Sequence, residues 1–484
     1  MYSFRAGSHT KENGEVSEME TFTDRTRRLD SMTGVGRCFD MIGRELVIGG
    51  RRAKLWVVNG YAESALLERL IAGWLAIPPQ ELPASGESFL RRYLSAADAQ
   101  TEREEEKAAQ AVLAGKTLLC LDGYEELLLI DAKTFPVRSI EEPDTSRVLR
   151  GSHDGFVENL MENAALLRRR IRTAALTLER CRVGGRSGCD VVLAYLEGKP
   201  RAADIEKLRQ KLSAVEANSV SMSQESIAES ILPSQWWNPF PRIRYTERPD
   251  VATACLMEGS ILLLVDNSPC VMLLPTTVFS FAEEINDYYF PPLVGTYLQA
   301  VRLAVLLLTV FITPLWYVLV KDPAHLHENL RFLLVQGESY VPLILQLLLV
   351  EFIIDVLKLA SLNTPNVLSN SFSMLGALIL GDFAVQSRWL VPEVLVYMAF
   401  VAVADYAQHS YEMSYACKLL RMAMLLLVWR WDWWGFGAGV LGALVLLLTV
   451  KPLVGRGYLY PLIPFDGKVL WRILHRQHIS RENT

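Results

Sequence analysis

Three ionisable residues lie within one strongly apolar stretch of the chain, at residues 341–362. Glu351, Asp355 and Lys358 occupy positions i, i+4 and i+7, a spacing that places their side chains on one face of an α-helix. Charges inside a membrane are costly and usually face protein or water. Two interpretations are possible. The three side chains form a polar stripe along an ion path, or Asp355 and Lys358 form an internal pair near the helix end.

Two further acids, Asp382 and Asp405, fall in other apolar stretches of the sequence. Asp382 has no assigned partner and is a further candidate for the ion path, because an ionisable residue within a membrane marks function by default. Asp405 lies close to the end of its stretch, so we expect its carboxylate to reach the water at the membrane surface.

No arrangement of residues indicates catalysis. The sequence has no Gly-rich phosphate loop, no nucleophile elbow and no paired histidines at zinc-protease spacing. The seven cysteines form no CxxC pair, which is typical of free thiols in a reducing compartment, and Cys181 and Cys189 lack neighbours at the spacing of a zinc site. We expect neither an enzyme nor a bound metal or cofactor. A net charge of −5 without a basic stripe gives no reason to expect nucleic acid.

Long apolar runs in the second half of the chain predict an α-helical polytopic membrane domain. A spanning helix needs about 20 predominantly apolar residues. The candidate spans are 296–320, 341–362, 372–386, 389–407, 415–431 and 433–450. The short stretch at 372–386, with glycine and proline around it, either spans or forms a re-entrant element, so we expect four to six spans. Basic residues after Lys451 favour a cytosolic C-terminus.

The charged first half predicts a cytosolic α/β region of two subdomains. Residues 1–33 are polar without periodicity or a signal peptide, so we expect disorder there and a cytosolic location for the two subdomains after them. Subdomain 1 covers 34–149, subdomain 2 covers 150–290, the membrane domain covers 291–455, and a cytosolic tail covers 456–484. The expected strands are 45–59 (a hairpin), 116–121, 125–131, 189–196, 260–265 and 271–274, and the expected helices are 63–75, 101–114, 156–170 and 202–214.

Several motifs in a fixed order resemble the spore germinant receptor A-subunit (GerA) family. They are GSHDGFVENLMENAALLRRRI at 151–171, FPRIRYTERPD at 240–250, EGSILLLVDNSPCVMLLP at 258–275 and INDYYFP at 285–291, and the resemblance covers about 34–475. One departure is clear. Receptor A subunits typically carry R-E-A-x-x-R-x-P after the second span, and here the sequence reads VLKLASLNTPN. That difference favours a role other than sensing nutrients.

The resemblance implies a protein of the inner spore membrane that acts in germination. Family members are thought to form ring-like homo-oligomers that release monovalent cations, and a member of this type is thought to amplify ion release together with a small membrane partner. In such a ring, Glu351 and Asp355 would form stacked acidic rings of the kind that cation pores use. If the acids do not face the axis, Val350, Phe352 and Ile354 would supply a hydrophobic constriction.

The TERPD motif is the second candidate site. It consists of Thr246, Glu247, Arg248, Pro249 and Asp250. Arg248 can pair with Glu247 or with Asp250, and Pro249 fixes the turn. The motif is therefore either a structural clamp, which orders the local fold, or a part that carries a signal.

Two rival functions stay open at this point. One is a secondary transporter with a midplane site in the broken region at 363–381. The other is a non-conducting scaffold that tethers the soluble region to the membrane. A transporter should show inverted repeats, and a scaffold should tolerate changes at Glu351 and Asp355.

Overall fold

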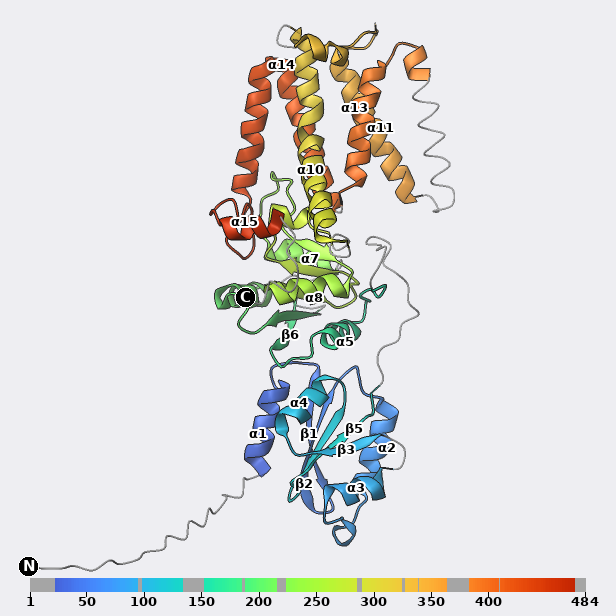
Figure 1. Ribbon diagram of the computed structural model, residues 1–484, viewed down its shortest axis with the longest axis vertical. Coiled ribbons are helices and arrows are strands. Elements are labelled where there is room, and N and C mark those ends of the chain that lie inside the picture. The colour runs from blue at the N-terminus through green and yellow to red at the C-terminus, as the bar shows by residue number, and fades with distance from the viewer. Residues whose placement is uncertain are drawn as a thin grey trace, which may run out of the picture. The chain divides into compact units, whose positions relative to one another are not determined.

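The computed structural model describes residues 22–94, 98–133, 152–184, 188–215, 223–284, 290–323, 327–337, 339–363, 383–408 and 410–474. These residues form two compact units. The first comprises the described residues up to 133 together with Ala164–Glu179, and the second comprises all the others. Figure 1 shows them as a ribbon and labels many of their helices and strands.

The first unit is built on a five-stranded sheet with the order β1-β2-β4-β5-β3. Its strands are β1 (Met41–Ile48), β2 (Arg51–Val58), β3 (Ala99–Glu102), β4 (Thr117–Leu121) and β5 (Leu127–Ile130), and neighbouring strands are antiparallel. Gly49 and Gly50 join β1 to β2 with φ of +55° and +73°. A two-residue hairpin turn requires these positive angles, which glycine adopts without steric cost.

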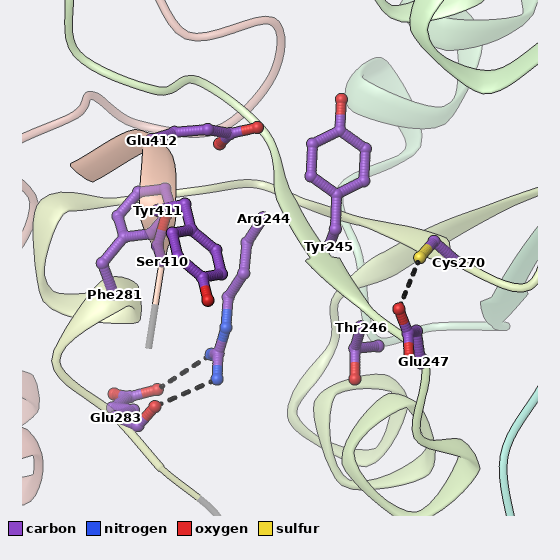
Figure 2. A pocket seen from close by; sticks show the side chains of 10 residues that line it. All are labelled: Arg244, Tyr245, Thr246, Glu247, Cys270, Phe281, Glu283, Ser410, Tyr411 and Glu412. Atoms are coloured by element: carbon purple, nitrogen blue, oxygen red, sulfur yellow. Dashed lines mark hydrogen bonds and ion pairs between the residues drawn. The ribbon is translucent and has the colours of Figure 1, made fainter. Parts of the chain in front are cut away.

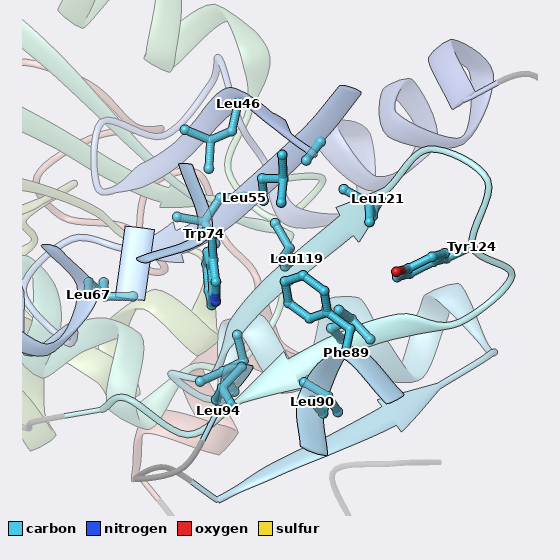
Figure 3. Close-up of a cluster of buried hydrophobic side chains, with 14 of the residues drawn as sticks. Leu46, Leu55, Leu67, Trp74, Phe89, Leu90, Leu94, Leu119, Leu121 and Tyr124 are labelled. Carbon is cyan, nitrogen blue, oxygen red and sulfur yellow. The ribbon is translucent and has the colours of Figure 1, made fainter. Parts of the chain in front are cut away.

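Helices cover both faces of this sheet. They are α1 (Phe22–Thr33), α2 (Ser64–Leu75), η1 (Pro79–Glu81), α3 (Gly86–Tyr93), α4 (Glu105–Leu113) and the end of α5 (Leu160–Arg170). Successive strand residues point to opposite faces. Leu119 therefore packs with Trp74 and Phe89 on one face (Figure 3), and its neighbour Leu118 packs with Leu29 and Val112 on the other.

Two predictions for this region were wrong. Residues 22–33 of the segment expected to be disordered form α1, because Leu29 is buried and Arg25 and Arg28 both pair with Glu105 of α4. Residues 99–102 form the edge strand β3, so the helix expected over 101–114 begins only at Glu105. A short polar edge strand has no apolar alternation, which explains why the sequence pattern did not reveal it.

A second five-stranded sheet has the order β6-β7-β9-β10-β8. Its strands are β6 (Leu176–Val183), β7 (Cys189–Leu196), β8 (Arg244–Thr246), β9 (Ile261–Val265) and β10 (Val271–Leu274), with helices α6 (Ala202–Ser213), α7 (Ser223–Ile231), α8 (Pro249–Glu258) and η2 (Val278–Phe281). The predicted strands at 189–196, 260–265 and 271–274 and the helix at 202–214 are confirmed. One face of this sheet packs with α6, α7 and residues Leu453 and Val454.

The apolar half of the chain contributes α10 (Pro292–Lys321), η4 (Glu328–Leu333), α11 (Leu343–Asn363), α13 (Pro392–Tyr406), α14 (Tyr411–Thr449) and α15 (Gly467–Leu474). Among the described residues, α10 and α14 are long and apolar enough to cross a membrane by length and composition. The helix α11 has 21 residues but carries three ionisable side chains, and α13 has 15 residues. The predicted span at 372–386 lies mainly outside the described residues.

The long helix α14 is a hairpin of two arms. Its backbone leaves the helical region at Asp432, with φ of 47° and ψ of −125°, which matches the break expected between 431 and 433. Gly435 approaches the backbone of Leu427, and Gly439 approaches Met424. From the first contact to the second, the residue moves away from the turn on both arms, from Gly435 to Gly439 on one and from Leu427 to Met424 on the other. This is the order that antiparallel arms require.

The second unit joins the second sheet to these helices, so a boundary at 290 does not separate two compact bodies. The reason is a set of bonds across that boundary. Gln235 donates a hydrogen bond to the carbonyl oxygen of Thr449 at 2.9 Å, and Val278 donates one to Tyr458 at 2.9 Å. The predicted boundary at 150 also differs, because Arg168 of α5 forms a fully buried bidentate pair with Asp40 of the first unit.

Candidate functional site

A network of charged side chains lies among the apolar helices α11 and α14. Glu351 Oε1 is 2.6 Å from Arg421 Nε, and the two side chains are 1% and 0% exposed. Lys418 lies one helical turn before Arg421 on the same face. Its Nζ is 3.3 Å from Glu351 Oε2 and 2.5 Å from Asp355 Oδ1, and it donates to the backbone oxygen of Glu351 at 3.1 Å. The two acids of α11 therefore meet two cations of α14.

A second pair joins α11 to α13. Lys358 Nζ is 3.0 Å from Asp405 Oδ2, and both side chains are largely buried. The expectation that Asp405 reaches water was therefore wrong. Its place near the end of a helix suggested exposure, but packing against α11 supplies a cation at hydrogen-bonding distance from Oδ2. This pairing offsets part of the cost of removing the carboxylate from water.

The network holds three acids and three bases, so its formal charges cancel. The acids are Glu351, Asp355 and Asp405, and the bases are Lys358, Lys418 and Arg421. Arg421 also donates to the backbone oxygen of Thr309 in α10 at 2.8 Å. Pairing lowers the large cost of burying charge, but replacement of a buried pair by apolar residues is often neutral or stabilising. The packing alone therefore does not require six charges here.

The apolar residues proposed for a constriction do not share one face. Val350 is buried in the cluster that joins α10, α11, α13 and α14, and Ile354 packs against the same cluster. Phe352 is 64% exposed, and Val356 and Leu359 are also exposed. These last three residues, at i, i+4 and i+7, form the outward apolar face of α11. Asp382, the remaining candidate for the ion path, lies outside the described residues.

The TERPD motif forms a buried clamp in the second sheet. Arg248, which is nearly inaccessible, binds Asp250 through two bonds, of 3.1 Å from Nε and 2.7 Å from Nη2. The same Nη2 donates to the backbone oxygen of Ser152 at 2.8 Å. Pro249 is the first residue of α8, where the missing N–H costs nothing. Thr246 Oγ1 accepts from the backbone N–H of Arg248 at 3.2 Å.

A cavity of about 200 Å³ lies between this motif and the start of α14 (Figure 2). It is lined by Arg244, Tyr245, Thr246, Glu247, Cys270, Phe281, Glu283, Ser410, Tyr411 and Glu412. Arg244 points towards Glu283 and donates to its backbone oxygen at 3.1 Å. Cys270 Sγ lies 3.4 Å from Glu247 Oε1, and burial together with this carboxylate raises the pKa of the thiol to about 12. The cavity therefore offers charge and hydrogen bonds to a small polar molecule, but its thiol is protonated and a poor nucleophile.

No group of three histidine, cysteine, aspartate or glutamate side chains among the described residues is arranged to hold a metal ion. The features that remain are the charged network, the clamp and the cavity. A comparison with known proteins assigns the chain to a family. Residues 29–484 match the family described as Bacillus/Clostridium GerA spore germination protein.

The chain belongs to the GerA spore germination family.

Individual GerA relatives cover almost the whole chain. Stage V sporulation protein AF of Bacillus subtilis is 33% identical over 92% of this chain and 90% of its own length. Spore germination protein KA of the same organism is 25% identical over 90% of this chain and 80% of its own. The crystal structure of the N-terminal domain of the A subunit of the Bacillus megaterium spore germinant receptor GerK3 aligns with 53% of this chain and 94% of that domain, at 22% identity and a TM-score of 0.41.

Two residues that are central to the charged network of this GerA protein were not predicted from the sequence. Lys418 and Arg421 lie in the predicted span at 415–431, and two cations three residues apart in an apolar stretch are a visible signal. Sequence reasoning placed Glu351, Asp355 and Lys358 on one face and left their partners open. The structure supplies those partners from α13 and α14.

Proposed function

We propose that the protein is a multi-pass protein of the inner spore membrane with its N-terminal region in the cytosol. We further propose that it is a subunit of a ring-shaped homo-oligomer that releases monovalent cations and amplifies ion efflux during germination, together with a small membrane partner and without a catalytic step. Membership of the GerA family and two helices of spanning length support the membrane and germination parts. The charged network supports the ion-conducting part.

The single observation that carries this proposal is the pairing of Glu351 and Asp355 with Arg421 and Lys418. A spore that stays dormant must hold its ions, so a closed state is required. In that state the cations of α14 neutralise the acids of α11, and no acidic site is open to a cation. A shift of α11 against α14 would release the acids, and carboxylates along a path attract cations.

Asp355 is the acid best placed to act first. Its side chain is 30% exposed, while Glu351 beside it is almost inaccessible. Asp355 also lies at the edge of the network, between Lys418 and the exposed face of α11 that Phe352, Val356 and Leu359 form. In an oligomer this face would contact either lipid or a neighbouring subunit, and the second arrangement would bring one Asp355 per subunit close to the same axis.

A non-conducting scaffold is the second candidate, and one observation favours it. Every acid of the network has a cationic partner within the chain, as a purely structural element would require. The two functions differ in what they predict for Asp355. A scaffold tolerates its neutralisation as long as the protein folds, whereas a channel loses part of the field that attracts cations.

The test is the release of potassium from germinating spores that carry Asp355→Asn or Glu351→Gln. Glu328→Gln is the matched control, because Glu328 is a highly exposed acid of η4 that takes no part in the network. Protein abundance is checked by immunoblot. Slower release from Asp355→Asn spores at normal abundance supports the conducting function. Release at the rate of the Glu328→Gln control excludes Asp355 from the path and favours the scaffold.

A further inference from the structure

Two segments outside the spanning helices expose large aromatic side chains. The tryptophan loop, residues 234–239, connects α7 to the strand β8, and in it Trp236 is 93% exposed and Trp237 is half exposed. The C-terminal segment, residues 461–474, contains α15 and exposes Ile463, Phe465 and Trp471. Adjacent large aromatic residues exposed to water are costly, and their exposure indicates a surface that is covered in use.

The tryptophan loop is bonded to the last turn of α14. Gln235 Nε2 donates to the backbone oxygen of Thr449 at 2.9 Å, and its Oε1 accepts from the backbone N–H of Lys451 at 3.0 Å. Asn238 Nδ2 donates to the backbone oxygen of Leu446 at 2.9 Å. These bonds satisfy carbonyl groups that a helix end leaves without partners. They also fix the two tryptophans at the level where the apolar arm ends.

The C-terminal segment is held at the same end of the helices. Gln299 of α10 donates to the backbone oxygen of Ile473 in α15. The charged residue Arg302 follows one turn later and pairs with Glu284 at 2.9 Å. The uninterrupted apolar run of α10 begins after Arg302, at residue 303. With a rise of about 1.5 Å per residue, Gln299 is about 5 Å on the water side of Arg302.

Basic residues accompany the aromatic ones. Lys451 lies two residues after Thr449, the last residue of α14, and Lys468 and Arg472 are exposed on α15 beside Trp471. Tryptophan is enriched at the boundary between hydrocarbon and headgroups. Lysine and arginine at that depth attract anionic lipids. The combination of exposed aromatic and basic side chains at the ends of two apolar helices fits a phospholipid surface better than a protein partner.

We propose that the tryptophan loop and the C-terminal segment together form a surface that inserts into the headgroup region of the bilayer and binds anionic phospholipid. This inference rests on the proposed insertion of α10 and α14 into a membrane. Its consequence is that the second sheet is attached to the membrane by its own loop as well as by the chain, which limits how far the sheet can tilt from the bilayer.

The test uses the full-length protein in liposomes of mixed anionic and zwitterionic phospholipid, with a spin label on single introduced cysteines. The described native cysteines are buried or half-buried, so an exposed cysteine is labelled preferentially. The variants are Trp236→Cys and Trp471→Cys. The control is Met257→Cys, because Met257 is an exposed apolar residue of α8, a helix that does not belong to the cluster formed with Leu453 and Val454. Depth is read from the relative access of oxygen and a water-soluble nickel chelate.

We expect labels at 236 and 471 to be several-fold less accessible to the nickel chelate than the label at 257, with the difference reduced in liposomes that lack anionic lipid. Equal accessibility at 236, 471 and 257 would overturn the inference. A fourth label, at Leu307→Cys on the exposed face of α10, separates the two proposals. If the label at 307 lies deep in the bilayer and the label at 236 lies in water, the proposed lipid-binding surface is refuted and the membrane insertion of α10 stands. If the label at 307 lies in water, membrane insertion itself is refuted.

Discussion

Glu351 and Arg421, which lie 70 residues apart in the sequence, form an ion pair of 2.6 Å from which water is almost completely excluded. The pair connects α11 to the first arm of α14, and Arg421 extends the connection to α10 through the backbone oxygen of Thr309. Three apolar helices thus meet at one guanidinium group. The stability of this region should depend on the pair as a unit.

We expect Glu351→Gln to destabilise the protein by about 3–5 kcal/mol, because it leaves the buried Arg421 without an acidic partner. Arg421→Gln should cost less, because Glu351 keeps Lys418 at 3.3 Å. The double variant should lose less than the sum of the two, since it leaves no unpaired charge from this pair. Thermal unfolding of the purified protein in detergent measures the difference. Additive losses would show that the two side chains do not act as a pair.

The turn of α14 predicts opposite effects for two neighbouring glycines. A methyl group at Gly435 would lie 2.0 Å from the backbone oxygen of Leu427 on the other arm, whereas nothing lies within 4 Å of the same position at Gly437. Gly435→Ala should therefore force the arms apart and cost about 1–3 kcal/mol or more. Gly437→Ala should be neutral or stabilise by up to about 1 kcal/mol through helix propensity.

Protein abundance in the membrane and the melting temperature in detergent measure both glycine variants. Equal behaviour of Gly435→Ala and Gly437→Ala would contradict the close approach of the arms. Gly435 and Gly439 are four residues apart, and small residues at this spacing let helix backbones approach closely in membranes.

Two arginine–aspartate pairs of similar geometry differ in burial, so they should differ in how much they contribute to the free energy of unfolding. Arg248 binds Asp250 through two bonds in the interior, and Arg201 binds Asp204 through two bonds of 2.8 Å and 2.9 Å at the surface. Arg248→Lys should cost about 1.5–3 kcal/mol, because lysine cannot make the fork and also keep the bond to Ser152. Arg201→Lys should cost less than about 1 kcal/mol.

Hydrogen exchange of the full-length protein tests the clamp locally. In the Arg248→Lys variant, faster exchange should be confined to the backbone around β8, α8 and Phe156, whose N–H bonds the backbone oxygen of Glu247 at 2.8 Å. Unchanged exchange in these segments would show that the motif does not clamp them and would favour its other interpretation, as a signalling part.

The cysteines predict a pattern of chemical reactivity. Burial raises the pKa of the Cys120 thiol to about 11 and the pKa values of Cys255 and Cys270 to about 12. Only the thiolate reacts quickly with alkylating reagents. At an exposed cysteine introduced by Met257→Cys in α8, the rate should rise about tenfold for each pH unit up to the thiol pKa of about 8.5. The three native thiols should stay slow throughout pH 6.5–8.5.

Mass spectrometry of peptides after timed alkylation measures the rate at each cysteine. The introduced cysteine is the internal standard in the same sample. Alkylation of Cys270 at the rate of the introduced cysteine would contradict its placement beside Glu247 in a closed environment, since a thiolate there would be disfavoured by both burial and the neighbouring carboxylate.

Much of the fold is determined by local patterns. Apolar strand residues and the Gly49–Gly50 turn determine β1 and β2. Two short apolar runs, one before and one after the turn at Asp266–Ser268, determine the hairpin of β9 and β10. These elements are recognisable because strand and turn preferences act over a few residues. The edge strand β3 and the helix α1 depend on partners distant in sequence, and their own composition does not reveal them.

For the candidate site, the sequence by itself determined that Glu351, Asp355 and Lys358 share one helical face, because the period of an α-helix fixes which residues align. It also limited the partners of Arg248 to Glu247 or Asp250. Only the tertiary structure decided that Lys418 and Arg421 neutralise the acids, that Lys358 binds Asp405, and that Phe352 rather than Val350 faces outward. Helical period relates residues within one helix, whereas the rotation of one helix against another depends on how all their side chains pack together.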